Sequence, residues 1–293
     1  MSSSPAMKGY RRLKEMSWKY LAARPSRTVE AWGCTIGGFS EYAAAPVHRL
    51  ELPPPAVVIV LCCGEPVTLQ PALNPGSSTA MSAFFAGLQV QAQCVAHSGI
   101  NDCIEIQLPP LAAYRLFGGT VSESNRDTVD LLEVARCPVN TLLDQLRATN
   151  CWQQRLAAVD RFIAHGLCES KRCVPPELSW AWQILERSHG QASIGSLART
   201  VGWSERHLIN QCRAFMGVRP KAMARRLRFS HAANLVSTQP TGSLCMIAAE
   251  AGFSDQSHMT REFQFFSGLT PSSLRTTRFE DLPGIPATAL MNR

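Results

Sequence analysis

The sequence predicts an α+β protein. It combines an N-terminal antiparallel β-barrel or sandwich with following helices and an all-α C-terminal domain of two helix-turn-helix motifs joined by a linker helix. Three observations predict this architecture. Short apolar runs separated by turn residues fill residues 31–107, longer amphipathic segments follow Pro110, and a pattern spanning residues 194–220 occurs again at 245–271.

The 293 residues, 45% of them hydrophobic, are enough for two domains with sizeable cores. The longest apolar stretch, residues 56–63, is far shorter than the roughly 20 residues that a membrane-spanning helix needs. The basic N-terminus is not followed by an apolar segment with a cleavage pattern, so it is a poor signal peptide. We therefore expect no membrane segment and a cytoplasmic location in a bacterium, at the nucleoid when bound to DNA.

The first half of the chain changes its pattern at Pro110. Before it, the apolar runs 56–61, 83–90 and 103–106 are separated by Pro, Gly, Asn and Ser, which is typical of short antiparallel strands. After it, apolar residues recur at spacings of three and four in the segments 111–117, 129–134, 139–148 and 152–163, which predicts helices. The polar and doubly proline segment 169–176 then predicts a linker between domains.

The eleven cysteines contain no CxxC pair, and Cys62 and Cys63 are adjacent, so that on a strand they would project to opposite faces. We therefore interpret the cysteines as reduced core residues, with a thiol sensor as the alternative. His48 and His97 lie far apart and outside any HxH pattern, so no metal site is predicted. No nucleophile, phosphate-loop or deaminase motif occurs, and we expect no enzyme, no catalytic residue and no cofactor.

The net charge of +7 is unevenly distributed along the chain. Residues 177–278 hold twelve Lys and Arg against six Asp and Glu, and the first thirty residues hold seven against two. The middle of the chain is therefore nearly neutral. This distribution indicates that the C-terminal third faces a polyanion.

The repeated pattern decides the function that we expect. Each copy has an apolar helix start, then Gly, an aromatic residue and Ser, then a second amphipathic helix and Gly-x-x-Pro. Gly202 and Gly252 are expected to end their helices at positive φ, and Ser204 and Ser254 to cap the next helices. Each copy is therefore a helix, a tight turn and a helix.

The second helix of each copy has an apolar face, Leu208, Cys212 and Phe215 or Met259, Phe263 and Phe266, and a polar face. Polar side chains of these kinds pair with base edges in a major groove about 12 Å wide, which admits a helix. Ile209 could contact a thymine methyl group or serve only as a packing residue. The predicted DNA-binding residues are Glu205, Arg206, Ile209, Asn210, Arg213, Gln256, Ser257, His258 and Arg261.

The segment 221–236 has apolar residues in helical rhythm, with Arg225, Arg226 and Arg228 expected to be exposed. As a linker helix it would hold the two motifs at a fixed separation. Two recognition helices could then enter successive major grooves, roughly 34 Å apart, on one face of the duplex. The three arginines are expected either to contact phosphates or to lie on a solvated face.

Residues 202–220 and 247–271 resemble the double helix-turn-helix domain of AraC/XylS-type transcription regulators. The second copy, GFSDQSHMTREFQFFSGLTP, resembles the family signature almost position for position. Cys212 and Asn210 depart from the usual bulky apolar residue and arginine, which implies fewer base contacts from the first helix. Residues 103–119 and the helices after them resemble, more weakly, the small β-barrel sensory domain that precedes such DNA-binding units.

This resemblance implies four segments. Residues 1–168 would form a sensory/effector or dimerisation domain, 169–176 a linker, 177–279 the DNA-binding domain and 280–293 a flexible tail. The expected function is sequence-specific, effector- or partner-controlled transcription regulation, with activation as the expected sign. Double-stranded promoter or operator DNA is the expected partner, with RNA polymerase, a small-molecule effector and a second copy of the chain as further candidates and no membrane.

Two alternatives remain. The chain could be a constitutive DNA-binding regulator whose N-terminal domain mediates only protein-protein contacts. It could also be a DNA repair methyltransferase with a regulator-like domain, although a motif such as PCHR is absent.

Overall fold

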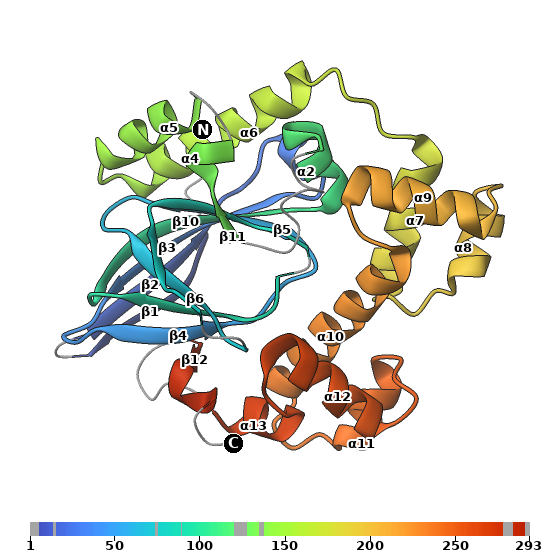
Figure 1. The fold of residues 1–293 in the computed structure, drawn as a ribbon. Coiled ribbons are helices and arrows are strands. Elements are labelled where there is room, and N and C mark those ends of the chain that lie inside the picture. The colour runs from blue at the N-terminus through green and yellow to red at the C-terminus, as the bar shows by residue number, and fades with distance from the viewer. Residues whose placement is uncertain are drawn as a thin grey trace.

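In the computed structural model, two antiparallel sheets face each other in the N-terminal part of the chain (Figure 1). The structure describes residues 6–13, 16–73, 76–88, 90–119, 128–134, 138–277 and 284–290. The first sheet has the order β1 (Ala6–Leu13), β2 (Met16–Ala22), β3 (Thr35–Tyr42), β10 (Ile100–Leu108), β5 (Val57–Cys62), β8 (Ala83–Ala86) and β11 (Thr128–Asp130). The second has the order β12 (Ile285–Pro286), β4 (Val47–Glu51), β9 (Gln93–His97), β6 (Val67–Pro71) and β7 (Thr79–Met81).

The helices of the N-terminal part cover the outer face of the first sheet (Figure 1). They are α1 (Arg27–Ala31), α2 (Pro110–Phe117), α4 (Leu131–Val134), α5 (Pro138–Arg147) and α6 (Trp152–Glu169). Alternation along each strand puts Ile104 and Ile106 of β10 on this outer face, where they are buried in one cluster with Val159 and Ile163 of α6. The inner faces of the two sheets enclose a cavity of about 350 Å³.

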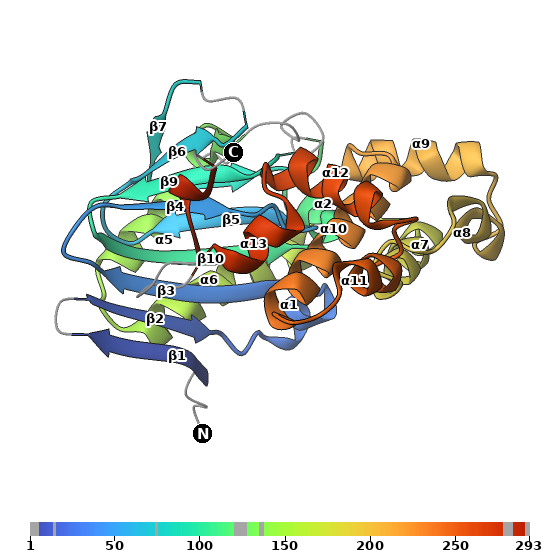
Figure 2. The ribbon, with the colours of Figure 1, turned by 90° about the horizontal axis from the view of Figure 1, so that it is seen from below.

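The C-terminal part is all helical and is organised around α10 (Pro220–Thr238). Figures 1 and 2 show α10 running between one group of helices, α7 (Pro176–Arg187), α8 (Ile194–Thr200) and α9 (Glu205–Met216), and a second group. The second group is α11 (Leu244–Glu250), α12 (Gln256–Ser267) and α13 (Pro271–Thr276). Buried residues lie on several sides of α10, as expected for a helix inside a domain. The predicted fold class is confirmed.

Two predicted elements differ from the structure. Residues 129 and 130 of the predicted helix 129–134 belong to β11, which pairs with β8, and only Leu131–Val134 is helical. Part of the expected flexible tail is also ordered. β12 pairs with β4, and η1 (Ala287–Leu290) follows it, with Ile285 and Ala289 buried. Residues 280–283 and 291–293 lie outside the described residues.

The cysteine prediction holds for part of the set. No disulfide joins the ten cysteines that the structure describes, and Cys34, Cys62, Cys63 and Cys212 are buried core residues. In contrast, Cys151, Cys168, Cys173 and Cys245 are exposed. Burial raises the pKa of the Cys34 and Cys212 thiols to about 12, which favours their protonated, unreactive form. Within the described part of the chain, no helix is both long and apolar enough to cross a membrane.

The N-terminal part contacts both halves of the helical part. The ring of Tyr114 on α2 lies 4.7 Å from that of Phe215 on α9. On the other half, the backbone N–H of Ala92 donates to the carbonyl of Phe266 at the end of α12, at 2.9 Å. Each helix-turn-helix motif therefore contacts the N-terminal part through its second helix, the first motif at α2 and the second at the β-sandwich.

Candidate nucleic-acid interface

The two turns have the same backbone structure. In the first, the N–H of Gly202 donates to the carbonyl of Arg199 and that of Trp203 to the carbonyl of Ala198. In the second, Gly252 and Phe253 make the equivalent bonds to Ala249 and Ala248. Gly202 has a φ of 72° and Gly252 a φ of 78°. The left-handed region that these values occupy is readily adopted by glycine, which explains the repeated Gly.

The helix after each turn is capped by a different residue type. Ser204 accepts a hydrogen bond from the N–H of His207 and so caps α9, as predicted. The cap of α12 is Asp255, whose carboxylate accepts from the N–H of His258 at 2.7 Å. The prediction of Ser254 as this cap is therefore wrong. The second turn is one residue longer, and the helix begins one residue later.

This extra residue changes which positions of the two recognition helices are equivalent. Counted from the start of each helix, Arg206 corresponds to Ser257, and Arg261 corresponds to Asn210. Arg206 and Arg261, two of the predicted DNA-binding residues, therefore occupy different helical positions. The same alignment pairs His207 with His258.

Both of these histidines contact the aromatic residue of their own turn. The ring of His207 lies 4.6 Å from that of Trp203, and the ring of His258 lies 5.3 Å from that of Phe253, both edge to face. Both aromatic residues were expected to be core residues, and Phe253 is buried whereas Trp203 is only half-buried. The histidines extend this packing to the recognition helices.

The predicted DNA-binding residues lie on the exposed faces of α9 and α12. Seven are exposed, and Ile209 and His258 are half-buried. The opposite faces are buried, with Leu208 and Cys212 in the core of the first motif and Met259 and Phe263 in that of the second. The structure thus separates a core face from a solvent-accessible polar face on each helix. The exposed residues are Glu205, Arg206, Asn210, Arg213, Gln256, Ser257 and Arg261.

The three arginines of the linker helix are not on a solvated face, so that prediction is wrong. Arg226 is 3% exposed, and its guanidinium donates to the carbonyls of Pro54, Leu88 and Val90 in the β-sandwich. Burial lowers the pKa of Arg226 to about 9, so it stays charged at neutral pH. Arg225 and Arg228 are half-buried and also have protein partners.

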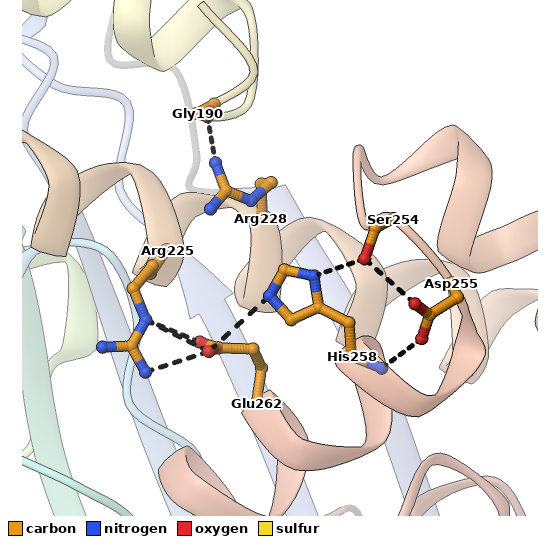
Figure 3. Close-up of polar contacts among 7 residues, drawn as sticks. All are labelled: Gly190, Arg225, Arg228, Ser254, Asp255, His258 and Glu262. Atoms are coloured by element: carbon orange, nitrogen blue, oxygen red, sulfur yellow. Dashed lines mark hydrogen bonds and ion pairs between the residues drawn. The ribbon is translucent and has the colours of Figure 1, made fainter. Parts of the chain in front are cut away.

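Arg225 joins the linker helix to the second recognition helix (Figure 3). Its Nε lies 3.1 and 3.0 Å from the two carboxylate oxygens of Glu262 on α12, and its Nη2 lies 2.9 Å from Oε1. The guanidinium also lies 4.9 Å from the centre of the Phe265 ring. Glu262 is a buried residue, and the ion pair neutralises its charge within the domain.

Arg228 joins the linker helix to the first half of the domain. Figure 3 shows its Nη1 donating to the carbonyl of Gly190, in the turn between α7 and α8, at 2.6 Å. Gln191 of the same turn donates to the carbonyl of Glu250 at the end of α11. These contacts, with those of Arg225, hold the two motifs at a defined separation.

His258 has protein groups near both ring nitrogens. Its Nδ1 lies 3.1 Å from Ser254 Oγ and its Nε2 lies 4.0 Å from Glu262 Oε1 (Figure 3). The side chain is 33% exposed, so one ring edge remains accessible. The imidazole therefore connects the turn to the Arg225–Glu262 ion pair.

Two exposed residues of the recognition helices were not among the predicted DNA-binding residues. Gln264 is exposed on α12 and corresponds to Arg213, and His207 is exposed beside Arg206. Both would have followed from aligning the motifs on Gly217 and Gly268, the left-handed C-caps, instead of on the first turn. Among the described residues no cluster of three or more His, Cys, Asp or Glu could hold a metal ion.

Comparisons with known proteins agree with this geometry. Residues 197–277 match the family model described as a helix-turn-helix domain, whereas no curated protein matches the chain. An AraC-type transcriptional regulator from Chromobacterium violaceum is 26% identical over 36% of this chain and 94% of its own, with a TM-score of 0.33. The C-terminal domain of AraT, a response regulator from Geobacillus stearothermophilus, is 21% identical over 37% of this chain and 90% of its own, with a TM-score of 0.34.

A third solved structure aligns with a larger share of the chain. ToxT from Vibrio cholerae is 12% identical over 83% of this chain and 97% of its own, with a TM-score of 0.46. These identities and TM-scores are low, and the assignment therefore rests on the matched C-terminal domain with its two equivalent turns. The match assigns a helix-turn-helix domain to residues 197–277 of the chain.

Proposed function

We propose that the chain is a sequence-specific, effector-controlled transcription regulator that reads its operator through α9 and α12. The observation that carries the DNA-binding part is the pair of equivalent turns that present polar, exposed helix faces on one scaffold. Arg206, Arg213 and Arg261 are the exposed cations of these two faces. Because Arg225, Arg226 and Arg228 have partners within the protein, the specific contacts are assigned to the recognition helices and not to the linker helix.

Effector control is supported by Arg226. The cavity between the two sheets is lined in part by Arg226, a residue of the DNA-binding domain. Its three carbonyl partners belong to the loops around β5 and β8–β9, so a ligand that moves these loops changes the attachment of α10. A ligand shifts the equilibrium between two domain arrangements only by its difference in affinity for them, and a few kcal/mol is enough.

The segments follow from this proposal. Residues 1–168 act as the sensory domain, 169–176 as the linker and 177–279 as the DNA-binding domain. The linker is docked, because Arg172 donates to the carbonyls of Arg115 and Leu116 at the end of α2. Activation is the proposed sign of regulation, and a promoter fused to a reporter gene tests it in cells with and without the chain.

The DNA-binding proposal is tested by genome-wide binding of the full chain, followed by a salt titration on the best fragment. We expect discrete promoter sites, an affinity that falls with salt, and loss of site preference in Arg261→Ala and Arg206→Ala. Each lost base contact should cost about 1–3 kcal/mol. Arg161→Ala is the matched control, because Arg161 is exposed on α6, in the N-terminal part. Diffuse binding that neither recognition-helix variant changes would refute the assignment.

A further inference from the structure

The cavity between the sheets has one apolar and one polar wall. Val58 and Val60 of β5 and Phe84 of β8 line the apolar side. The polar side is formed by two strands from opposite sheets, with Glu105 and Gln107 on β10 and Glu51 on β4. The cavity therefore suits a molecule with an apolar body and one polar head group.

One arginine, Arg49, is shared between Glu51 of the polar wall and the neighbouring Glu41, so a single cation pairs with two carboxylates. Arg49 Nη2 lies 2.7 Å from Oε2 of Glu41, a fully buried carboxylate, whereas Arg49 Nε lies 3.9 Å from Oε1 of Glu51. The Arg226 guanidinium at the mouth donates to three backbone carbonyls. Glu105 accepts a hydrogen bond from the amide of Gln107 at 2.7 Å, which leaves its charge in place. Glu105 therefore gives this wall a negative charge, and Glu51 adds to it when it is ionised.

Two buried acceptors beside these carboxylates also lack a donor. Asn101 Oδ1 and Glu41 Oε1 have no hydrogen-bond partner among the described residues, and Asn101, which is 9% exposed, lines the cavity. The two residues are paired across β3 and β10, on the inner face of the sheet. A buried acceptor without a donor is costly, and a ligand in the cavity that brings an N–H group removes this cost at Asn101, which lines the cavity.

We propose that this cavity binds an organic cation, with a protonated amine between Glu51 and Glu105 and an apolar body against the strands β5 and β8. The inference rests on the proposed effector role of the cavity and names the chemical class of the effector. An anionic head group would meet the Glu105 carboxylate and the Asn101 side-chain oxygen. An amine supplies both the charge and the hydrogen-bond donors that this wall lacks.

The protonation of Glu51 makes the proposed binding depend on pH. Burial raises the pKa of Glu51 to about 7, with Glu105 and Glu41 adding to the effect and Arg49 opposing it. Arg226 and His97 also line the cavity, although neither is among the groups that set this pKa. Glu51 is therefore partly neutral at pH 6 and ionised at pH 8. The affinity for a cation should rise over that range.

The test uses three probes with one apolar body, namely 4-phenylbutylamine, 4-phenylbutanol and 4-phenylbutanoate. Binding to the full chain is measured by calorimetry and thermal shift in the absence of DNA, so its outcome is separate from that of the DNA-binding proposal. We expect the amine to bind, to bind more tightly at pH 8 than at pH 6, and to lose affinity at least tenfold in Glu105→Gln and Glu51→Gln. These variants keep the side-chain shape.

Glu65→Gln is the matched control, because Glu65 is exposed and contacts Ser98 outside the cavity. It should leave amine binding unchanged. Equal or tighter binding of the carboxylate or the alcohol overturns the proposal, and so does amine binding that neither cavity variant weakens. Absence of amine binding at millimolar concentration also overturns it. If the amine binds as expected while the chain fails to bind DNA, the cavity assignment stands and the regulator proposal fails.

Discussion

The guanidinium of Arg225 contacts both carboxylate oxygens of Glu262, and through this ion pair the linker helix holds the second recognition helix. Replacing Arg225 by alanine leaves the buried Glu262 carboxylate without its main partner. Removing one partner of a buried ion pair reduces the free energy of unfolding by about 3–5 kcal/mol. Because Arg225 is partly exposed, we expect a smaller loss of about 2 kcal/mol. Urea unfolding of Arg225→Ala measures the loss in the free energy of unfolding.

The double variant Arg225→Ala with Glu262→Ala should lose less stability than the sum of the single variants, because it no longer buries an unpaired charge. Arg261→Ala is the control on the same helix, and its exposed side chain predicts a change within about 0.5 kcal/mol. Additive single losses would show that the two side chains do not interact.

The caps of the recognition helices give a second prediction. Ser204→Ala removes the acceptor for the N–H of His207 and should cost about 1 kcal/mol. In the second motif, Asp255→Ala should reduce the thermal stability more than Ser254→Ala, because the Asp255 carboxylate accepts the helix N–H bond. The hydrogen bond from the His258 N–H and a second one from the Ser254 hydroxyl both lower the pKa of Asp255. The cap therefore stabilises the fold at neutral pH, and this stabilisation is lost as pH falls through the lowered pKa. Thermal melts of the three variants at pH 7 and pH 3 check both statements, and a larger effect of Ser254→Ala would assign the cap to Ser254.

The helix-turn-helix motifs could be predicted from the sequence because their signals are local. The repeated glycines, the apolar spacing and the aromatic residues are all set by the conformation of a short segment, and the structure has them where they were expected. The strands of the first sheet were recognisable for a similar reason, since turn residues bounded their apolar runs. The strands β1 and β2, which precede the region where strands were predicted, are exceptions, and so are residues 128–130. These last residues join the sheet by pairing with β8, a contact distant in sequence.

The partners of the linker arginines could not be predicted, because they lie far away in the sequence. Arg226 and the carbonyl of Leu88 are 138 residues apart in the sequence. A charged side chain on a helix is normally expected to lie in solvent. The docking of β12 on β4 has the same origin. One signal was present in the sequence. The apolar residues of 221–236 fall on several sides of the helix, which is typical of a central helix with few solvated positions.

Arg226 should control how firmly the two parts of the chain are attached. Arg226→Met keeps the length of the side chain and removes the donors to Pro54, Leu88 and Val90, and each charged hydrogen bond lost costs about 1.5–3 kcal/mol before water replaces it. We expect a net loss of about 2–4 kcal/mol and faster proteolysis within residues 170–175. Arg219→Met, at the exposed start of the same helix, is the control. Proteolysis at the wild-type rate would show that this contact does not hold the parts together.

The stacked pair His189 and His231 predicts a loss of stability in acid. The two rings lie 4.0 Å apart and nearly parallel, between the turn after α7 and the linker helix. Burial lowers the pKa of His231, the neighbouring His189 lowers it further, and Glu250 opposes both effects. Because the folded-state pKa lies below the unfolded value of about 6.5, the stabilisation is complete above that value and is lost as pH falls through the folded-state pKa. The free energy of unfolding is measured at pH 7.5 and at pH 5.0, and the difference between the two values should be smaller in His231→Gln than in the wild type. His165→Gln, at an exposed position of α6, is the control and should retain the full difference. An unchanged pH dependence in His231→Gln would assign the acid sensitivity to other groups and leave the stacked pair as a packing contact alone.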